Sequence, residues 1–200
     1  MLDKNTDMEQ EPKSVFTTRK IVVAGVLSAI AVFLGLTGWG FVPVPTAAGN
    51  ATILQIPAII GGVVEGPLVG AVIGFIFGVS SFLHATVPFF KDPSVAILPR
   101  IFIGVFGYYA YVIVKRLHIF STKRWGGIIL AIGAAGLVGS VTNTVLVLAM
   151  IYLRGYLSLQ ACASIALING VPEAIVSIII TVAVVSAWWR LDRGHKGSRI

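Results

Sequence analysis

Arg100 is the side chain with the clearest capacity for chemistry, because it stands in a long apolar run from Ala96 to Gly104. An ionisable group at membrane depth is costly and usually has a partner or a task. The guanidinium offers a fixed fork of donors that suits a carboxylate or a phosphate. Two interpretations stay open: Arg100 faces a cavity and binds an anionic ligand, or it reaches a lipid headgroup.

Further polar and aromatic side chains stand at the ends of apolar segments or within them. An unsatisfied amide is costly in hydrocarbon, so these groups should face the bundle interior or a cavity. One interpretation is hydrogen bonding between helices, which is common in membranes. The other is a small-ligand pocket, where amides recognise hydroxyl and amide groups and aromatic rings form an apolar wall. The candidate ligand-binding residues are Arg100, Asn50, Gln55, Asn143, Asn169, Trp39 and His84.

Glu173 follows Pro172 in the last apolar segment, and the sequence leaves its role open. It is expected to be protonated, to pair with a cation, or to line water at a helix break. Glu65 falls in a predicted turn, where we expect a carboxylate in contact with solvent or the lipid interface.

Signatures of enzymes and of metal sites are missing from the sequence. No Ser and His are expected at a common membrane depth, which a Ser–His dyad requires. No paired acidic metal motif and no phosphate-binding Walker loop occur. We therefore expect a protein that is not an enzyme, that holds no metal or cofactor, and that does not itself use ATP.

The composition indicates a membrane protein, since 56% of residues are hydrophobic and 12% are charged. A soluble domain carries about 25% charged residues. Apolar periodicity predicts an all-α protein with six transmembrane helices, over residues 21–38, 53–64, 68–83, 95–114, 127–152 and 159–188. The intervening segments 39–52 and 84–93 are predicted to be loops.

The positive charges predict the topology. Three clusters lie before the first predicted helix, between the fourth and fifth, and after the sixth. With six crossings all three fall on one face, as the positive-inside rule requires. We expect cytoplasmic N- and C-terminal tails, residues 1–18 and 191–200, around a membrane domain of residues 19–190. The charges are then explained by topology and by anionic lipid, without nucleic acid.

Small residues form two helical patterns. Gly25 and Ala29 make a smooth stripe in the first helix, which serves either internal packing or docking of another membrane subunit. Glycine also recurs at every fourth position from Gly66 to Gly78. This ridge allows a neighbouring backbone to lie against it.

In their order along the chain, these features resemble the substrate-binding S-component of energy-coupling factor (ECF) vitamin transporters, over about residues 19–188. The family usually shows Ala-x-x-x-Ala in its first helix, where this chain has Gly25 and Ala29. The residues that carry the resemblance are Gly25 and Ala29, Asn50-Ala51-Thr52, Gln55-Ile56-Pro57, Gly61-Gly62, Glu65-Gly66-Pro67, Gly70, Gly74, Gly78-Val79-Ser80-Ser81, and Leu98-Pro99-Arg100 with Gly104.

The resemblance implies a six-helix subunit in a bacterial-type cell membrane that binds a vitamin from outside. It implies a membrane coupling subunit, docked on Gly25 and Ala29, and two cytoplasmic ATPase subunits that use ATP. It further implies toppling of the subunit within the membrane to deliver the vitamin. The loops 39–52 and 84–93 would act as gates.

Among the subtypes, the stretch from Asn50 to Arg100 most resembles the pantothenate group. Pantothenate has one carboxylate, one amide and two hydroxyls. Arg100 would pair with the carboxylate, and the candidate amides would meet the other groups. Cobalamin, folate, riboflavin and pyridoxine remain alternatives, as do a membrane enzyme and a lipid-binding assembly factor.

Overall fold

The computed structural model describes residues 17–46, 49–117 and 125–197. For residues 42–46, 49–51, 125 and 192–197 it describes the backbone alone. Nearly all of the predicted N-terminal tail lies outside the described residues. The predicted C-terminal tail begins inside the last helix, which continues to Gly197.

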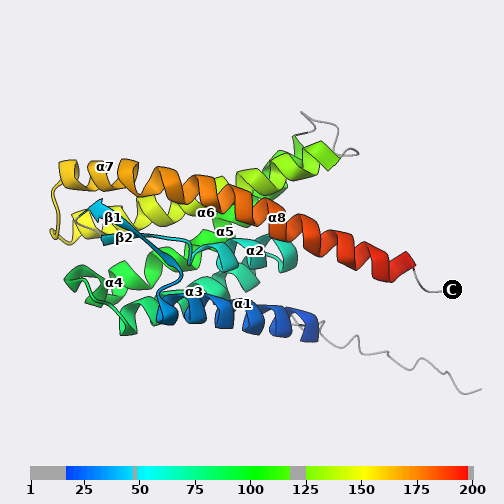
Figure 1. The fold of residues 1–200 in the computed structure, drawn as a ribbon, viewed down its shortest axis with the longest axis horizontal. Helices are drawn as coiled ribbons and strands as arrows, with labels where there is room; N and C mark the ends of the chain where they lie inside the picture. Colours follow the sequence, from blue (N-terminus) through cyan, green and yellow to red (C-terminus); the bar gives the residue numbers. More distant parts are fainter. Residues whose placement is uncertain (1–16, 47–48, 118–124, 198–200) are drawn as a thin grey trace, which may run out of the picture.

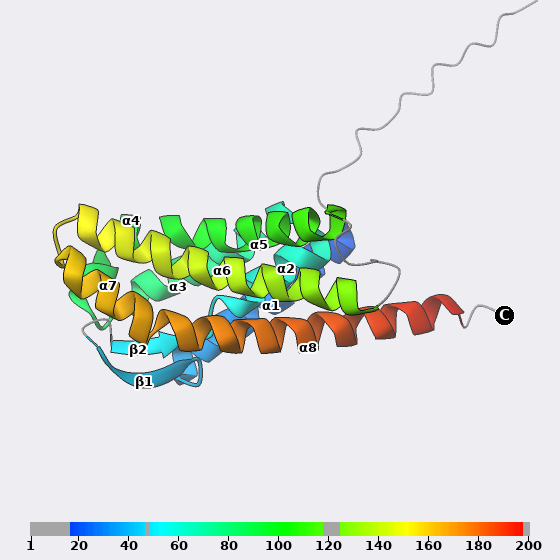
Figure 2. The ribbon, with the colours of Figure 1, turned by 90° about the horizontal axis from the view of Figure 1, so that it is seen from above.

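The chain forms an elongated helical bundle with one short hairpin (Figures 1 and 2). Its elements are α1 (Thr18–Thr37), β1 (Phe41–Thr46), β2 (Gly49–Thr52), α2 (Ile56–Glu65), α3 (Pro67–Leu83), the 3-10 helix η1 (Pro88–Lys91), α4 (Pro93–Ala96), α5 (Leu98–Arg116), α6 (Trp125–Leu153), α7 (Leu159–Ile168) and α8 (Gly170–Gly197). The core lies between α2, α3, α5 and α6, where Ile59, Ile73, Ile103 and Ile132 are fully buried.

A helical membrane fold agrees with the sequence. Within residues 17–46, 49–117 and 125–197, four helical segments are long and apolar enough to cross a membrane. They correspond to α1, to α4 with α5, to α6, and to α7 with α8. The helices α2 and α3 are apolar but shorter, with 10 and 17 residues. A crossing by all six predicted helices stays a prediction.

The segment predicted as a loop over residues 39–52 contains an antiparallel hairpin. Phe41 pairs with Thr52, and the register shifts between Val42 and Thr46. The cause of both the shift and the missed prediction is the sequence of β1, Phe-Val-Pro-Val-Pro-Thr. Proline cannot donate to a strand ladder, so it is unusual in strands and confined to edges or irregular positions.

Two of the predicted long helices are broken by proline. Pro99 cannot donate to the carbonyl of Val95, and Pro172 cannot donate to the carbonyl of Ile168. The chain accordingly begins new helices at Leu98 and Gly170. Arg100 therefore lies in the first turn of α5 rather than within one continuous helix over residues 95–114. Glu173 likewise lies in the first turn of α8 rather than in mid-helix.

The glycine ridge of α3 packs against backbone, as predicted. A methyl group at Gly70 would lie 2.9 Å from the Cα atoms of both Gly104 and Gly62. One at Gly78 would lie 2.8 Å from the Cα of Ile97. Gly66 does not belong to this ridge, because it forms the turn before α3 with a φ of 106°. The ridge brings α5, which carries Arg100, into close contact with α3.

The two ends of the bundle differ in character. The start of α1, the end of α5 and the end of α8 lie at one end, which we call the basic end (Figure 2). There Arg19 Nε forms an ion pair of 2.7 Å with Glu65 Oε1, so Glu65 is paired rather than simply solvated. The other end, called the hairpin end, carries β1, β2, α4 and the α6–α7 corner. Which end faces the cytoplasm stays a prediction.

Candidate ligand-binding cavity

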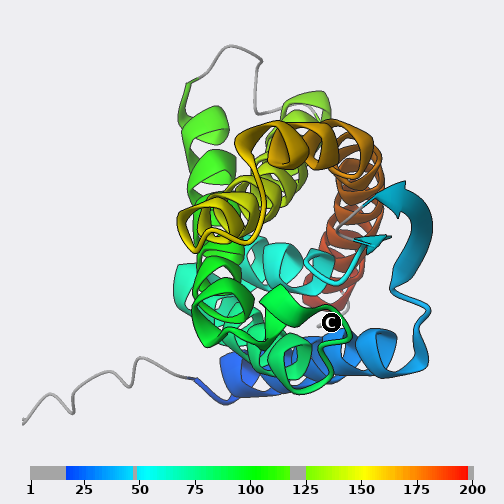
Figure 3. The ribbon, with the colours of Figure 1, turned by 90° about the vertical axis from the view of Figure 1, so that its left-hand side faces the viewer.

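A cavity of about 450 Å³ lies at the hairpin end of the bundle. Ligand sites for small molecules commonly have volumes of about 300–1,000 Å³. Figure 3 shows this end, with helices and the hairpin arranged around the interior. The polar part of the wall consists of Thr52, Ser80, Ser81, His84, Thr86, Arg100, Asn143, Thr144, Asn169 and Glu173.

Arg100 is fixed in the cavity wall by hydrogen bonds from its two terminal nitrogens. Nη1 donates to the carbonyl of Val95, the group that Pro99 leaves without its helical donor. Nη2 donates to Ser81 Oγ over 3.4 Å. The same proline that breaks the helix thus creates an acceptor that holds the guanidinium.

Two aromatic rings complete the setting of Arg100. Its Cζ lies 4.9 Å from the ring centroid of Phe90 and 5.5 Å from that of Phe77. The residue is only 4% exposed, and its Nε has no hydrogen-bond partner among the described residues. No carboxylate in the described part of the chain forms an ion pair with it. Arg100 therefore faces the cavity rather than a lipid headgroup, and retains a donor for an anion.

Two of the predicted amides reach the same cavity. Asn143 lies within α6, and Asn169 ends α7 at the break before α8. Both are buried, and within the described part of the chain the Oδ1 atom of each has no hydrogen-bond partner. Most buried polar atoms in proteins are hydrogen-bonded. These two oxygens are acceptors that a ligand with hydroxyl or amide donors would satisfy.

Glu173 is the ionisable cavity residue that the sequence did not assign. Its Oε1 accepts a hydrogen bond of 2.6 Å from the backbone N–H of Thr52 in β2. It lies in the first turn of α8, where the helix dipole favours negative charge. The signal for this position is Pro172, which places the helix break beside the carboxyl group.

The other candidate residues have different locations. His84 lines the cavity. Gln55 is buried away from the cavity, and its Nε2 donates to Ser140 Oγ in α6 over 3.4 Å, which fits the interpretation of hydrogen bonding between helices. Trp39 is 78% exposed in the turn before β1 and is not part of the wall. Asn50 lies in β2, and its side chain lies outside the described atoms.

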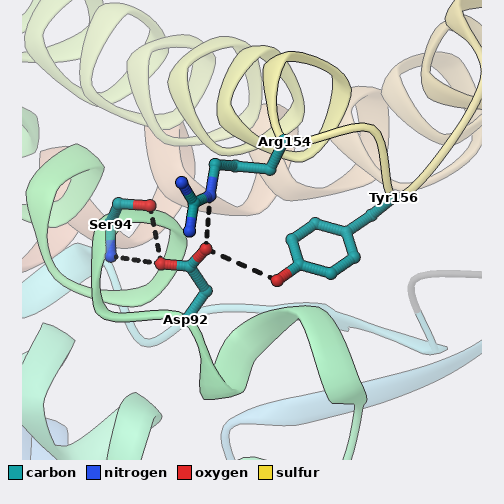
Figure 4. A network of polar contacts seen from close by, with 4 residues as sticks. All are labelled: Asp92, Ser94, Arg154 and Tyr156. Atoms are coloured by element: carbon teal, nitrogen blue, oxygen red, sulfur yellow. Dashed lines mark hydrogen bonds and ion pairs between the residues drawn. The ribbon is translucent and has the colours of Figure 1, made fainter.

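A polar clasp centred on Asp92 joins two segments at the hairpin end (Figure 4). Asp92 Oδ2 accepts from Arg154 Nε over 2.6 Å and from the Tyr156 hydroxyl over 3.4 Å. Its Oδ1 accepts from the Ser94 hydroxyl and amide over 2.7 and 3.0 Å. The segment between α3 and α5, which includes Phe90 of the cavity wall, is thereby tied to the α6–α7 corner.

These contacts also act on the titration of Asp92. The hydrogen bond from the Ser94 hydroxyl lowers the pKa of Asp92 most, and the Ser94 amide and the Arg154 guanidinium act in the same direction. Burial opposes them, but the net pKa lies below the ordinary value of 3.8. The clasp therefore holds an ionised carboxylate at neutral pH.

Comparison with known proteins identifies the family of this chain. Residues 19–185 match the family described as ECF transporter, substrate-specific component. The chain belongs to this family, and it is a multi-pass membrane protein of the transporter class that the sequence indicated.

Two relatives make the comparison more specific. The chain is similar to the pantothenic acid transporter PanT of Lactococcus lactis subsp. cremoris (strain MG1363). The two are 31% identical over 161 residues, which cover 68% of this chain and 76% of that protein. The structure of the present chain is similar to that of ThiT from Listeria monocytogenes, with a TM-score of 0.62 and 15% sequence identity. The match covers 86% of this chain and 96% of the ThiT chain. The second likeness concerns the fold alone.

Proposed function

We propose that this chain is the pantothenate-binding subunit of an ECF transporter. The proposal rests on the buried guanidinium of Arg100 in the cavity wall, which forms no ion pair with a carboxylate of the described chain and whose Nε has no hydrogen-bond partner there. A ligand with one carboxylate matches this arrangement. The similarity to a pantothenic acid transporter supports the same ligand.

The remaining groups of pantothenate also find suitable surfaces. Its amide N–H and its two hydroxyls are donors for the unpaired oxygens of Asn143 and Asn169. Its dimethyl-substituted carbon would lie against the apolar part of the wall, to which Val147 and Leu148 contribute. The hairpin and the segment of residues 84–93 border the cavity and act as gates.

In this proposal, delivery of pantothenate into the cell requires partner subunits. A membrane coupling subunit docks on the face of α1 that carries Gly25 and Ala29, and two cytoplasmic ATPase subunits supply the energy of ATP. Both residues are exposed, and a methyl group at Gly25 would meet nothing within 4 Å. This stripe is thus not used for packing within the described chain. Toppling of the subunit would carry the cavity toward the cytoplasm.

Ligand identification tests the proposed substrate. The protein is expressed in cells supplied with pantothenate, purified in detergent and denatured, and the released small molecules are identified by mass spectrometry. We expect one pantothenate per chain. Release of a different vitamin, or protein that is empty and fails to bind a vitamin panel, would contradict the assignment.

Substitutions on α1 test the proposed docking face. We expect Gly25→Trp and Ala29→Trp to retain pantothenate binding but to lose co-purification with the coupling subunit and uptake in cells. The matched control is Val145→Trp, on an exposed position of α6, which should retain all three properties. Unimpaired assembly of both α1 variants would refute the docking face.

A further inference from the structure

Glu173 carries an ionisable carboxyl group in largely apolar, buried surroundings. It is 7% exposed, stands in an apolar helix and lines the cavity. Ionisable groups within membrane segments are expensive and commonly mark a ligand or ion site. Its Oε1 accepts a hydrogen bond from the Thr52 amide, and the Thr144 hydroxyl is a further hydrogen-bond partner of the carboxyl group. An ionised carboxyl group has about four acceptor positions, so it can accept further hydrogen bonds.

Glu173 and Arg100 place two ionisable groups in the cavity wall. Arg100 extends from α5 and Glu173 from α8, and Figure 3 shows these helices on different sides of the bundle interior. The two side chains form no ion pair with each other. A ligand between them would meet a guanidinium on one side and a carboxyl group on the other.

We propose that Glu173 determines ligand specificity by accepting hydrogen bonds from the hydroxyl end of the ligand and by rejecting ligands that carry negative charge at that end. The inference rests on the proposed function, in which the pantothenate carboxylate pairs with Arg100. The hydroxyl end of the ligand then lies toward α8. A ligand hydroxyl donates to Glu173, whereas a phosphate ester on that hydroxyl places two anions together in a poorly solvated site. Discrimination by such an unfavourable contact is a general route to specificity.

The bond from the backbone N–H of Thr52 allows a substitution at Glu173 that preserves this contact. Glu173→Gln keeps an amide oxygen that can accept from the Thr52 amide, so the link between α8 and β2 is retained. The other oxygen becomes an NH₂ group, which donates rather than accepts. The variant removes any negative charge and replaces one acceptor oxygen of the cavity wall with a donor, with little change in shape. Glu173→Asp is the complementary variant, because it keeps the charge on a shorter side chain.

The test measures dissociation constants in detergent for pantothenate and for its phosphate ester on the terminal hydroxyl. We expect the wild type to prefer pantothenate by about 100-fold or more. Loss of a hydrogen bond to a charged group corresponds to about 10- to 100-fold in affinity. Glu173→Gln should weaken pantothenate binding by about that factor and reduce the preference over the ester to about tenfold or less. Glu173→Asp should retain the preference.

Glu65→Gln is the matched control, because it makes the same change at the basic end, outside the cavity wall. It should leave both affinities unchanged. If Glu173→Gln rejects the ester as strongly as the wild type does, the specificity role is refuted, while pantothenate binding by the wild type would still support the proposed function. If the wild type binds no pantothenate, both the function and this inference are overturned.

Discussion

Replacing Arg100 is expected to remove the recognition of the ligand carboxylate. With Nη1 and Nη2 directed to Val95 and Ser81, the free Nε offers a charge-assisted hydrogen bond to a ligand carboxylate, with further Coulomb attraction in a buried site. Truncating one partner of a buried, hydrogen-bonded charge pair costs about 2–5 kcal/mol. At 1.4 kcal/mol for each tenfold change, this corresponds to about 30- to 3,000-fold weaker binding of pantothenate. Arg100→Lys should lie in between, because it keeps the charge but loses the planar fork.

A thermodynamic cycle separates this role from a structural one. Titration calorimetry measures binding of pantothenate, and of its alcohol analogue without the carboxylate, to the wild type and to Arg100→Ala. The wild type should bind the alcohol much more weakly than pantothenate, and Arg100→Ala should bind the two about equally. A coupling energy below about 0.5 kcal/mol, the range in which independent changes simply add, would refute direct pairing. Equal losses for both ligands would then assign Arg100 to packing of the wall.

Two further predictions concern the supports of the site. Gly70→Ala places a methyl group against the backbone of Gly104 and should cost about 1–3 kcal/mol of stability. Calorimetric melting should show a lower Tm than for Gly126→Ala, where no described atom lies within 4 Å of the added methyl group. Equal Tm values would argue against the tight α3–α5 contact. Asp92→Asn removes the ionised partner of Arg154 and so weakens the link between the segment that carries Phe90 and the α6–α7 corner. Because this segment borders the cavity, we expect faster release of labelled pantothenate. Because the pKa of Asp92 is lowered, its contribution is complete above the unfolded value of 3.8 and is lost as pH falls below it. Release of pantothenate from the wild type should therefore accelerate as the pH falls below 3.8. An identical acceleration in Asp92→Asn would contradict a role of the ionised Asp92 in retaining the ligand.

The sequence predicts the parts of the site that follow from the cost of polar groups in apolar surroundings. Arg100, Asn143 and Asn169 were selected for that reason, and all three line the cavity. Gln55 satisfied the same criterion but is buried against α6. The criterion gives the depth of a polar residue, whereas its direction depends on the rotation of the helix and on the packing of neighbours.

Helix breaks account for most of the remaining differences. Apolar composition is continuous across Ile97 and Asn169, so periodicity predicts uninterrupted helices. The prolines that follow are the local signal, since each leaves a carbonyl without its helical donor. Phe77 was not expected in the wall, because its position depends on the close α3–α5 contact made possible by distant glycines. Such a contact is a tertiary property that no local pattern contains.

A structure of the protein with pantothenate bound would show which group of the ligand Arg100 contacts. We expect the ligand carboxylate at a charge-assisted hydrogen-bond distance of about 2.7–2.9 Å from the Arg100 guanidinium, with the hydroxyl end toward Asn169 and Glu173. A ligand bound in the reverse orientation, or one that leaves Arg100 without contact to its carboxylate, would contradict this expectation.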